Sequence, residues 1–183
     1  HSWVGLDGTR YLALGTDRKL YVYSEGALYD ITPLRATESL TNPFATTSGS
    51  STVTVTDASH GAGVGDFVTF DNGSATNVVD GIDFNNEFEI LTVPTSNTFT
   101  VDAGTNATGS TASGGGSVTA TYQITIGEAT STYGYGWGTE TWSASTWDTP
   151  RSSSNVIVYA RNWSLDNFGE DLVATVLNGS TYK

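Results

Sequence analysis

Residues 51–56 read Ser-Thr-Val-Thr-Val-Thr, a strict alternation of small polar and β-branched apolar side chains. Successive side chains of a strand point to opposite faces of a sheet, so this stretch would bury its valines and expose its hydroxyl groups. The same period of two recurs at 67–70, 88–93, 98–101 and 118–126, and no segment has a convincing period of 3.6 residues. The pattern predicts an all-β chain, with about five or six strands of this region in a small, half-buried sandwich or barrel.

The alternation also predicts which residues form the core of this β module. They are Val53, Val55, Val64, Phe67, Val68, Phe70, Phe88, Ile90, Val93, Phe99 and Val101. Residues 103–117 are rich in Gly, Ser, Thr and Ala, a composition typical of a flexible hairpin tip or loop. The most helix that we expect is a single turn around Ala36 to Leu40.

Strand-like runs separated by turns also lie on both sides of this module. The N-terminal runs at 11–14, 20–23 and 28–31 predict an antiparallel meander. Pro33 would close it, because a proline has no N–H to donate to a central ladder. The C-terminal runs lie at 156–159, 163–165 and 172–176, followed by a turn at 178–180 and by Tyr182. Each end has roughly the strand content of one propeller blade or one sheet of a sandwich.

The basic residues divide the chain in the same way. All 7 lie in its two ends, and none lies between positions 36 and 150, although the formal net charge is −12. They are Arg10, Arg18, Lys19, Arg35, Arg151, Arg161 and Lys183. A composition that shifts and then reverts indicates one domain with another inserted into it. We predict a discontinuous, propeller-like β domain at 1–35 and 123–183, and an inserted acidic β module at 36–122.

Composition narrows the classes of function. The acidic insertion argues against a phosphate-binding surface there, because nucleic-acid binders need clustered Lys and Arg. No cysteine is present, so neither disulfides nor thiolate metal sites stabilise the fold. No apolar run approaches the roughly 18 residues of a membrane segment. The chain opens with His1-Ser2-Trp3, in what we interpret as mid-strand, so we expect it to be a piece of a longer polypeptide.

An aromatic, glycine-rich segment follows the insertion. Aromatic rings there have almost no aliphatic neighbours, so we expect them to pack on the parent domain or on a neighbouring subunit and not on a ligand. Two arginines close by would pair with acids across such a contact. The predicted subunit interface consists of Tyr133, Tyr135, Trp137, Trp142, Trp147, Arg151 and Arg161.

Catalytic and metal-binding motifs were sought in the same way. His60 has no activated nucleophile beside it in the sequence, so we interpret it as a turn residue and not a general base. The acidic run 80–89 lacks the register of an EF-hand, which favours a solvated loop and strand edge. Gly134, Gly136 and Gly138 precede no strand-to-helix junction, so they form no dinucleotide loop. We therefore expect no catalytic residue, no metal and no cofactor. A carboxylate pair for glycoside hydrolysis stays open, because its spacing depends on the fold.

Several segments resemble virion structural proteins of short-tailed bacteriophages, in particular the tail nozzle or hub family. They are YLALGTD at 11–17, KLYVY at 19–23, LYDITP at 28–33, GYGWG at 134–138, TPRS at 149–152 and WSLDNFGEDLVA at 163–174. The insertion, with SHGA at 59–62, GDFV at 65–68 and FEI at 88–90, is similar to small β modules common in phage tail proteins. The resemblance covers roughly residues 9–35, 58–101 and 133–183. The family has no catalytic motif to transfer.

That resemblance implies a structural protein of the virion tail and no enzyme. Its propeller-like subunits would form a homo-oligomeric ring around the DNA ejection channel, in contact with adaptor or other tail proteins and transiently with viral DNA. The insertion would project outward toward fibres or a host surface. The alternative is a carbohydrate-binding or adhesin-type β-sandwich, with Trp137, Trp142 and Trp147 as a sugar-stacking platform. A secreted hydrolase is a third hypothesis, which would need two convergent carboxylates in a cleft.

Overall fold

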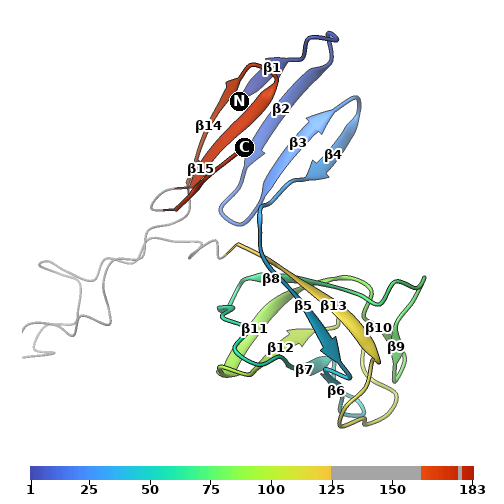
Figure 1. Cartoon of the computed structure of the whole chain (residues 1–183). Coiled ribbons are helices and arrows are strands. Elements are labelled where there is room, and N and C mark those ends of the chain that lie inside the picture. Colours follow the sequence, from blue (N-terminus) through green and yellow to red (C-terminus); the bar gives the residue numbers. More distant parts are fainter. Residues whose placement is uncertain (125–161, 177–178) are drawn as a thin grey trace, which may run out of the picture. The chain divides into compact units, whose positions relative to one another are not determined.

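The computed structural model describes residues 1–124, 162–176 and 179–183, and every regular element in this part of the chain is a β-strand (Figure 1). The all-β prediction is confirmed. The chain divides into two compact units, unit 1 with residues 1–31 and 126–183, and unit 2 with residues 32–125.

Unit 2 is built around one antiparallel sheet of seven strands in the order β5-β13-β8-β11-β12-β7-β6. A two-stranded hairpin, β9 and β10, accompanies it. The strands are β5 (Leu34–Thr41), β6 (Phe44–Ala45), β7 (Thr52–Thr56), β8 (Phe67–Asp71), β9 (Val78–Val79), β10 (Ile82–Asp83), β11 (Glu87–Thr95), β12 (Thr98–Asp102) and β13 (Ser117–Gln123). The curled sheet is left open between β5 and β6, although Phe44 makes a bridge to Gly114 in the loop after β12.

The core of unit 2 is a cluster of aromatic and β-branched side chains. Phe44 lies at its centre, fully buried, with its ring stacked on Phe84 at 3.8 Å and edge-on to Phe70 at 5.0 Å. Eight of the predicted core residues are buried, namely Val53, Val55, Val68, Phe70, Phe88, Ile90, Phe99 and Val101. Phe67 and Val93 are only partly buried. The prediction for Val64 is wrong, because it lies in the loop before β8 and is 67% exposed.

Two local predictions in unit 2 need correction. The helical turn expected at Ala36 to Leu40 is part of β5, which pairs with β13 from Thr41 to Leu34. Residues 103–116 form a loop as predicted, with Ser117 already in β13, but the loop packs on the module: Ala107 is buried and its N–H donates to Ser50 O at 2.9 Å. Tertiary pairing outweighs local propensity in both cases.

Unit 1 has two sheets in its described part. The first is the meander β1-β2-β3-β4, and the second has the order β14-β15-β16, with all neighbours antiparallel. The strands are β1 (Ser2–Val4), β2 (Arg10–Gly15), β3 (Leu20–Ser24), β4 (Ala27–Asp30), β14 (Trp163–Phe168), β15 (Asp171–Val176) and β16 (Thr181–Tyr182). The predicted N-terminal meander is confirmed, as are the strands at 163–165 and 172–176. The run at 156–159 lies outside the described residues.

Side chains from the two ends of the chain connect these sheets. Trp163 Nε1 donates to Thr16 O at 2.9 Å, and Trp3 Nε1 donates to Glu170 O at 3.0 Å. Gly15 permits the first contact, because a Cβ at this position would lie 2.6 Å from the Trp163 ring. Segments about 150 residues apart in the sequence thus form one unit.

Candidate interaction surfaces

The predicted subunit interface lies outside the described residues. Its members are Tyr133, Tyr135, Trp137, Trp142, Trp147, Arg151 and Arg161, all between positions 125 and 161. In the described residues, two other surfaces on the N-terminal sheet are candidates for interaction.

The first surface is one face of the N-terminal meander, which we call the meander face: Val4, Leu12, Leu14, Tyr23 and Leu28. Leu12 pairs with Tyr23, which pairs with Leu28, so one apolar row crosses three strands. These five side chains are exposed, from 38% for Leu12 to 59% for Val4. Contiguous exposed apolar side chains of this kind mark interaction sites.

Charged residues lie at the two ends of the meander face. Arg10 pairs with Val4 across the β1–β2 ladder and therefore shares its face. At the other end Asp30, which follows Leu28 on the same face, accepts a hydrogen bond from Lys19 Nζ at 2.8 Å. An apolar centre with a polar rim is the usual anatomy of a protein–protein interface.

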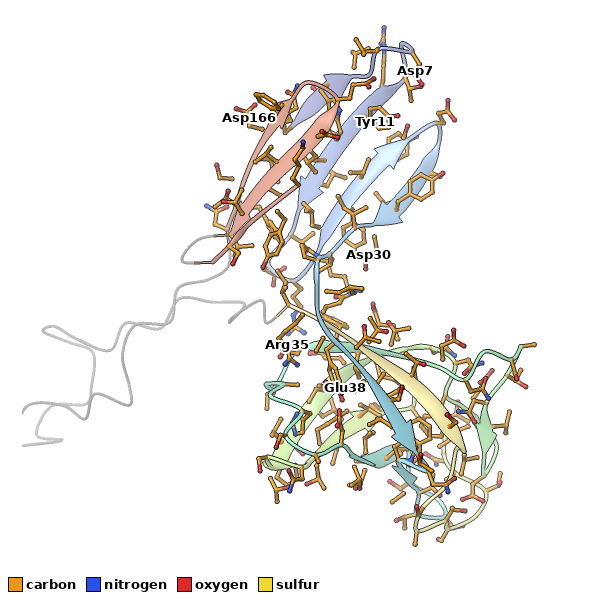
Figure 2. The ribbon with its side chains drawn as sticks, in the orientation of Figure 1. Asp7, Tyr11, Asp30, Arg35, Glu38 and Asp166 are labelled. Atoms are coloured by element: carbon orange, nitrogen blue, oxygen red, sulfur yellow. The ribbon has the colours of Figure 1, made fainter. Side chains whose placement is uncertain are left out.

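The second surface is a hollow on the opposite side of the same sheet, with a volume of about 640 Å³. Its aromatic residues are Trp3, Tyr11 and Tyr29, and its acidic residues are Asp7, Glu25 and Glu170. Figure 2 shows Tyr11 on the sheet and Asp7 in the loop beyond it. The hollow also has the hydroxyl groups of Thr9 and Ser24 and the apolar side chains of Val22 and Ile31.

Register explains where the hollow lies. Tyr11 pairs with Ser24, which pairs with Ala27, so two small side chains follow a large ring along one row. On its other side the Tyr11 ring stacks on Trp3 at 5.1 Å and 22°, and Trp3 stacks on His1 at 6.0 Å. The hollow lies along this row, with the small, buried Ser24 beside the Tyr11 ring in its lining.

Two of the carboxylates of the hollow are held by hydrogen bonds, one of them local and the other between the two ends of the chain. Asp7 accepts from the backbone N–H and from the hydroxyl of Thr9, at 2.9 and 2.8 Å, and these bonds lower the pKa of Asp7. Glu170 Oε1 accepts from the N–H of Leu6. Glu25 lies with Gly26 in the two-residue turn between β3 and β4, both at positive φ. The carboxylates are thus placed by backbone geometry at the rim.

His60 lies in unit 2 and is buried, 5% exposed. Its Nδ1 accepts from the N–H of Ala62 at 3.1 Å, so Nε2 carries the proton and points to Thr95 O at 3.3 Å. One ring nitrogen therefore bonds within the predicted turn, and the other bonds to the end of β11. Close by, Arg35 Nη1 donates to His60 O at 3.0 Å, and its guanidinium lies 5.2 Å from the centre of the Tyr122 ring.

A buried phenol and carboxylate extend this group of polar contacts. Tyr122 Oη donates to Asp57 Oδ2 at 2.5 Å, and both residues are buried. Burial, then the hydrogen bond to Asp57, raises the pKa of Tyr122, so the phenol stays a donor. The contacts join β5, the residue after β7 and β13, and they stabilise the module.

The acidic run 80–89 is partly structural. Asp80 and Gly81 form the turn between β9 and β10, and Asp80 accepts a hydrogen bond from the buried Thr46. Asp83 accepts from the N–H groups of Asn77 and Asn85. In the described part of the chain, no group of three or more His, Cys, Asp or Glu is arranged to hold a metal ion. No helix in that part is long and apolar enough to span a membrane.

Comparisons with known proteins give little likeness. No family model matches the sequence, and no curated protein matches it. Among solved structures, the chain is similar to Phage phi92 endosialidase, with a TM-score of 0.42 and 22% sequence identity. The match covers 63% of this chain and spans only 18% of the endosialidase chain.

Sequence reasoning did not identify either surface, although each has a signal. The runs Leu12-Ala13-Leu14 and Leu20-Tyr21-Val22-Tyr23 are continuously apolar, which indicates strands with apolar side chains on both faces. The hollow depends on which residues pair across strands, and register is set by the turns. The two-residue turn at Glu25-Gly26 is the local signal for that register.

Proposed function

We propose that this chain is a structural protein of a bacteriophage tail, which assembles through the meander face into a ring of the nozzle or hub type. The single observation that carries the assembly is the row of Leu12, Tyr23 and Leu28, exposed across three strands. Burying a leucine or valine side chain contributes about 1.5–3 kcal/mol, so covering five apolar residues would supply a substantial driving force.

The sequence resemblance to tail proteins supports the biological setting. In this proposal the chain lies in the virion tail, contacts adaptor or other tail proteins, and meets viral DNA only transiently during ejection. The acidic unit 2 would project toward fibres or a host surface, and its negative field would disfavour adhesion to DNA. We assign no catalysis to it.

The experiment is to measure the mass of the full chain in solution by light scattering and to image it by negative stain. We expect particles of a fixed multiple of 19.3 kDa, with rings in the images. Leu12→Glu should reduce the mass to that of one chain, because it places a carboxylate at the centre of the contact. Leu91→Glu is the matched control, because Leu91 is 40% exposed in unit 2 and Leu12 is 38% exposed.

Each result bears on a separate part of the proposal. A monomeric wild-type chain would contradict assembly through this face, as would an oligomer that survives Leu12→Glu. A closed dimer that is lost in Leu12→Glu would keep the meander face as a contact but exclude a ring.

A further inference from the structure

We propose that the hollow beside Tyr11 binds a neutral carbohydrate. The hollow lies on the side of the N-terminal sheet opposite the meander face, so this site is independent of the assembly proposed above. The shape of the hollow, its aromatic surface, its hydrogen-bonding groups and its charge all fit such a ligand.

The shape suits a small ligand. Its volume of about 640 Å³ falls within the range of roughly 300–1,000 Å³ that is usual for small-molecule sites. Ser24, which pairs with Tyr11 across the sheet, is a small side chain in the lining and leaves room beside the Tyr11 ring. The hollow is an open one on a sheet face, which allows a chain of sugars to extend beyond it.

The aromatic surface suits the apolar face of a sugar ring. The C–H groups on one face of a hexose carry a slight positive charge, which matches the negative face of an aromatic ring. The stack of His1, Trp3 and Tyr11 holds the Tyr11 ring in place, with spacings of 6.0 and 5.1 Å. Trp3 stacks on one face of Tyr11, and Tyr11 lines the hollow, so we expect the ligand to contact this ring from the hollow.

The hydrogen-bonding groups suit sugar hydroxyls. Carboxylates accept hydrogen bonds strongly, and Asp7, Glu25 and Glu170 lie around the hollow. Asp7 and Glu170 keep further lone pairs after accepting from Thr9 and Leu6. The Ser24 hydroxyl lies at the base and donates to Arg10 O at 3.3 Å, which leaves its oxygen as an acceptor.

Charge selects among carbohydrates. Three carboxylates and no Lys or Arg line the hollow, so a sialylated or uronic-acid glycan would be repelled. Hydrogen bonds from Thr9 to Asp7 and from Leu6 to Glu170 offset part of the carboxylate charge. The hydroxyl oxygens of Thr9 and Ser24 can accept hydrogen bonds from the hydroxyl groups of a polyol. The combination therefore fits an uncharged hexose or N-acetylhexosamine oligosaccharide.

The test is to apply the full chain to a glycan array with neutral gluco-, galacto- and N-acetylhexosamine oligosaccharides beside sialylated ones, and to titrate the best neutral glycan by calorimetry. We expect binding of neutral glycans only. Tyr11→Leu should weaken it about tenfold, the loss of one aromatic contact. Tyr182→Leu is the matched control, because Tyr182 is a partly buried tyrosine of unit 1 outside the hollow and outside the meander face.

A second variant protects the test against loss of folding in Tyr11→Leu. Glu25→Gln changes only a carboxylate in an exposed turn, and it should weaken glycan binding while the circular dichroism spectrum stays unchanged. The proposal is overturned if no neutral glycan binds, or if Tyr11→Leu and Glu25→Gln both bind as the wild type does. Tighter binding of sialylated glycans, or of spermidine, would also overturn it.

Discussion

Unit 2 and unit 1 handle their apolar residues in opposite ways. In unit 2 the rings of Phe44, Phe70, Phe84 and Phe99 are fully buried in one cluster. In the described part of unit 1, the buried apolar residues are Ala13, Leu20, Ala174 and Val176, while larger side chains of the meander are exposed. A module that buries its large apolar side chains in one core can fold alone. A unit that leaves large apolar side chains exposed depends on contacts with other chains or other parts of its own chain.

The largest expected effect comes from the aromatic centre of unit 2. Phe44→Ala should lower the free energy of unfolding of unit 2 by about 3–5 kcal/mol, the usual loss for a buried phenylalanine. Leu14→Ala, in unit 1, should change stability by less than about 1 kcal/mol, because Leu14 is 42% exposed.

The two units can be followed separately in that experiment. All 5 tryptophans lie outside residues 32–125, so tryptophan fluorescence reports on unit 1, and hydrogen exchange of peptides from unit 2 reports on the module. Phe44→Ala should leave the fluorescence transition unchanged. If Phe44→Ala shifts the fluorescence transition as much as it shifts the hydrogen exchange of unit 2, the two units unfold together. That result would contradict the view that unit 2 folds alone.

A smaller effect is expected from the close packing around Gly115. This glycine has a φ of 103°, and a Cβ there would lie 2.4 Å from the Phe44 ring. Gly115→Ala should therefore destabilise unit 2 by roughly 3 kcal/mol, through both strain and overpacking. Gly116 is the matched control: its φ is 66° with nothing within 4 Å, so Gly116→Ala should cost only about 1 kcal/mol.

Denaturant unfolding, monitored by hydrogen exchange of unit 2 peptides, would measure the difference in unfolding free energy between the two glycine variants. Equal losses would mean that the loop before β13 yields to a methyl group. In that case the core of unit 2 would be loosely packed around Phe44, and it would not differ from unit 1 in the way described above.

The smallest expected effect is the dependence of unit 2 on pH. Hydrogen bonds from Thr46 and then Thr111 lower the pKa of Asp80. A lowered pKa means that this stabilisation is complete above the unfolded value of about 3.9 and is lost as the pH falls through the folded value. Asparagine tolerates the positive φ of 49° at this position. The Asp80→Asn variant should therefore lose less thermal stability than the wild type when the pH is lowered from about 6 to 3. Parallel curves for variant and wild type would exclude a role for this carboxylate.

Much of the fold could be predicted from alternation alone. The pairs Val53 and Val55, and Phe99 and Val101, indicate strands because the buried residues of each pair are two positions apart. Phe44 escapes such a prediction because β6 has only two residues, which is too short to show a period. Phe84 escapes it because it follows the equally short β10.

The candidate surfaces could not be predicted to the same degree. The sequence shows an apolar meander but does not say which of its faces the C-terminal sheet leaves open. The hollow needs Tyr11 opposite Ser24 and Glu170 near Trp3, about 167 positions away along the chain. Such a juxtaposition depends on tertiary contacts, which leave no local pattern.

The way the chain enters and leaves unit 2 has a practical consequence. Leu34 and Gln123 are partners at the start of β5 and the end of β13, and Ile124 N donates to Pro33 O at 2.9 Å. Two ends held this close can be joined by a tight turn at little entropic cost. The paired residues Leu34 and Gln123 therefore mark a site for replacing a domain. An affinity tag, a fluorescent domain or an unrelated module with closely spaced ends could replace residues 35–122, because the two flanking residues would keep their spacing.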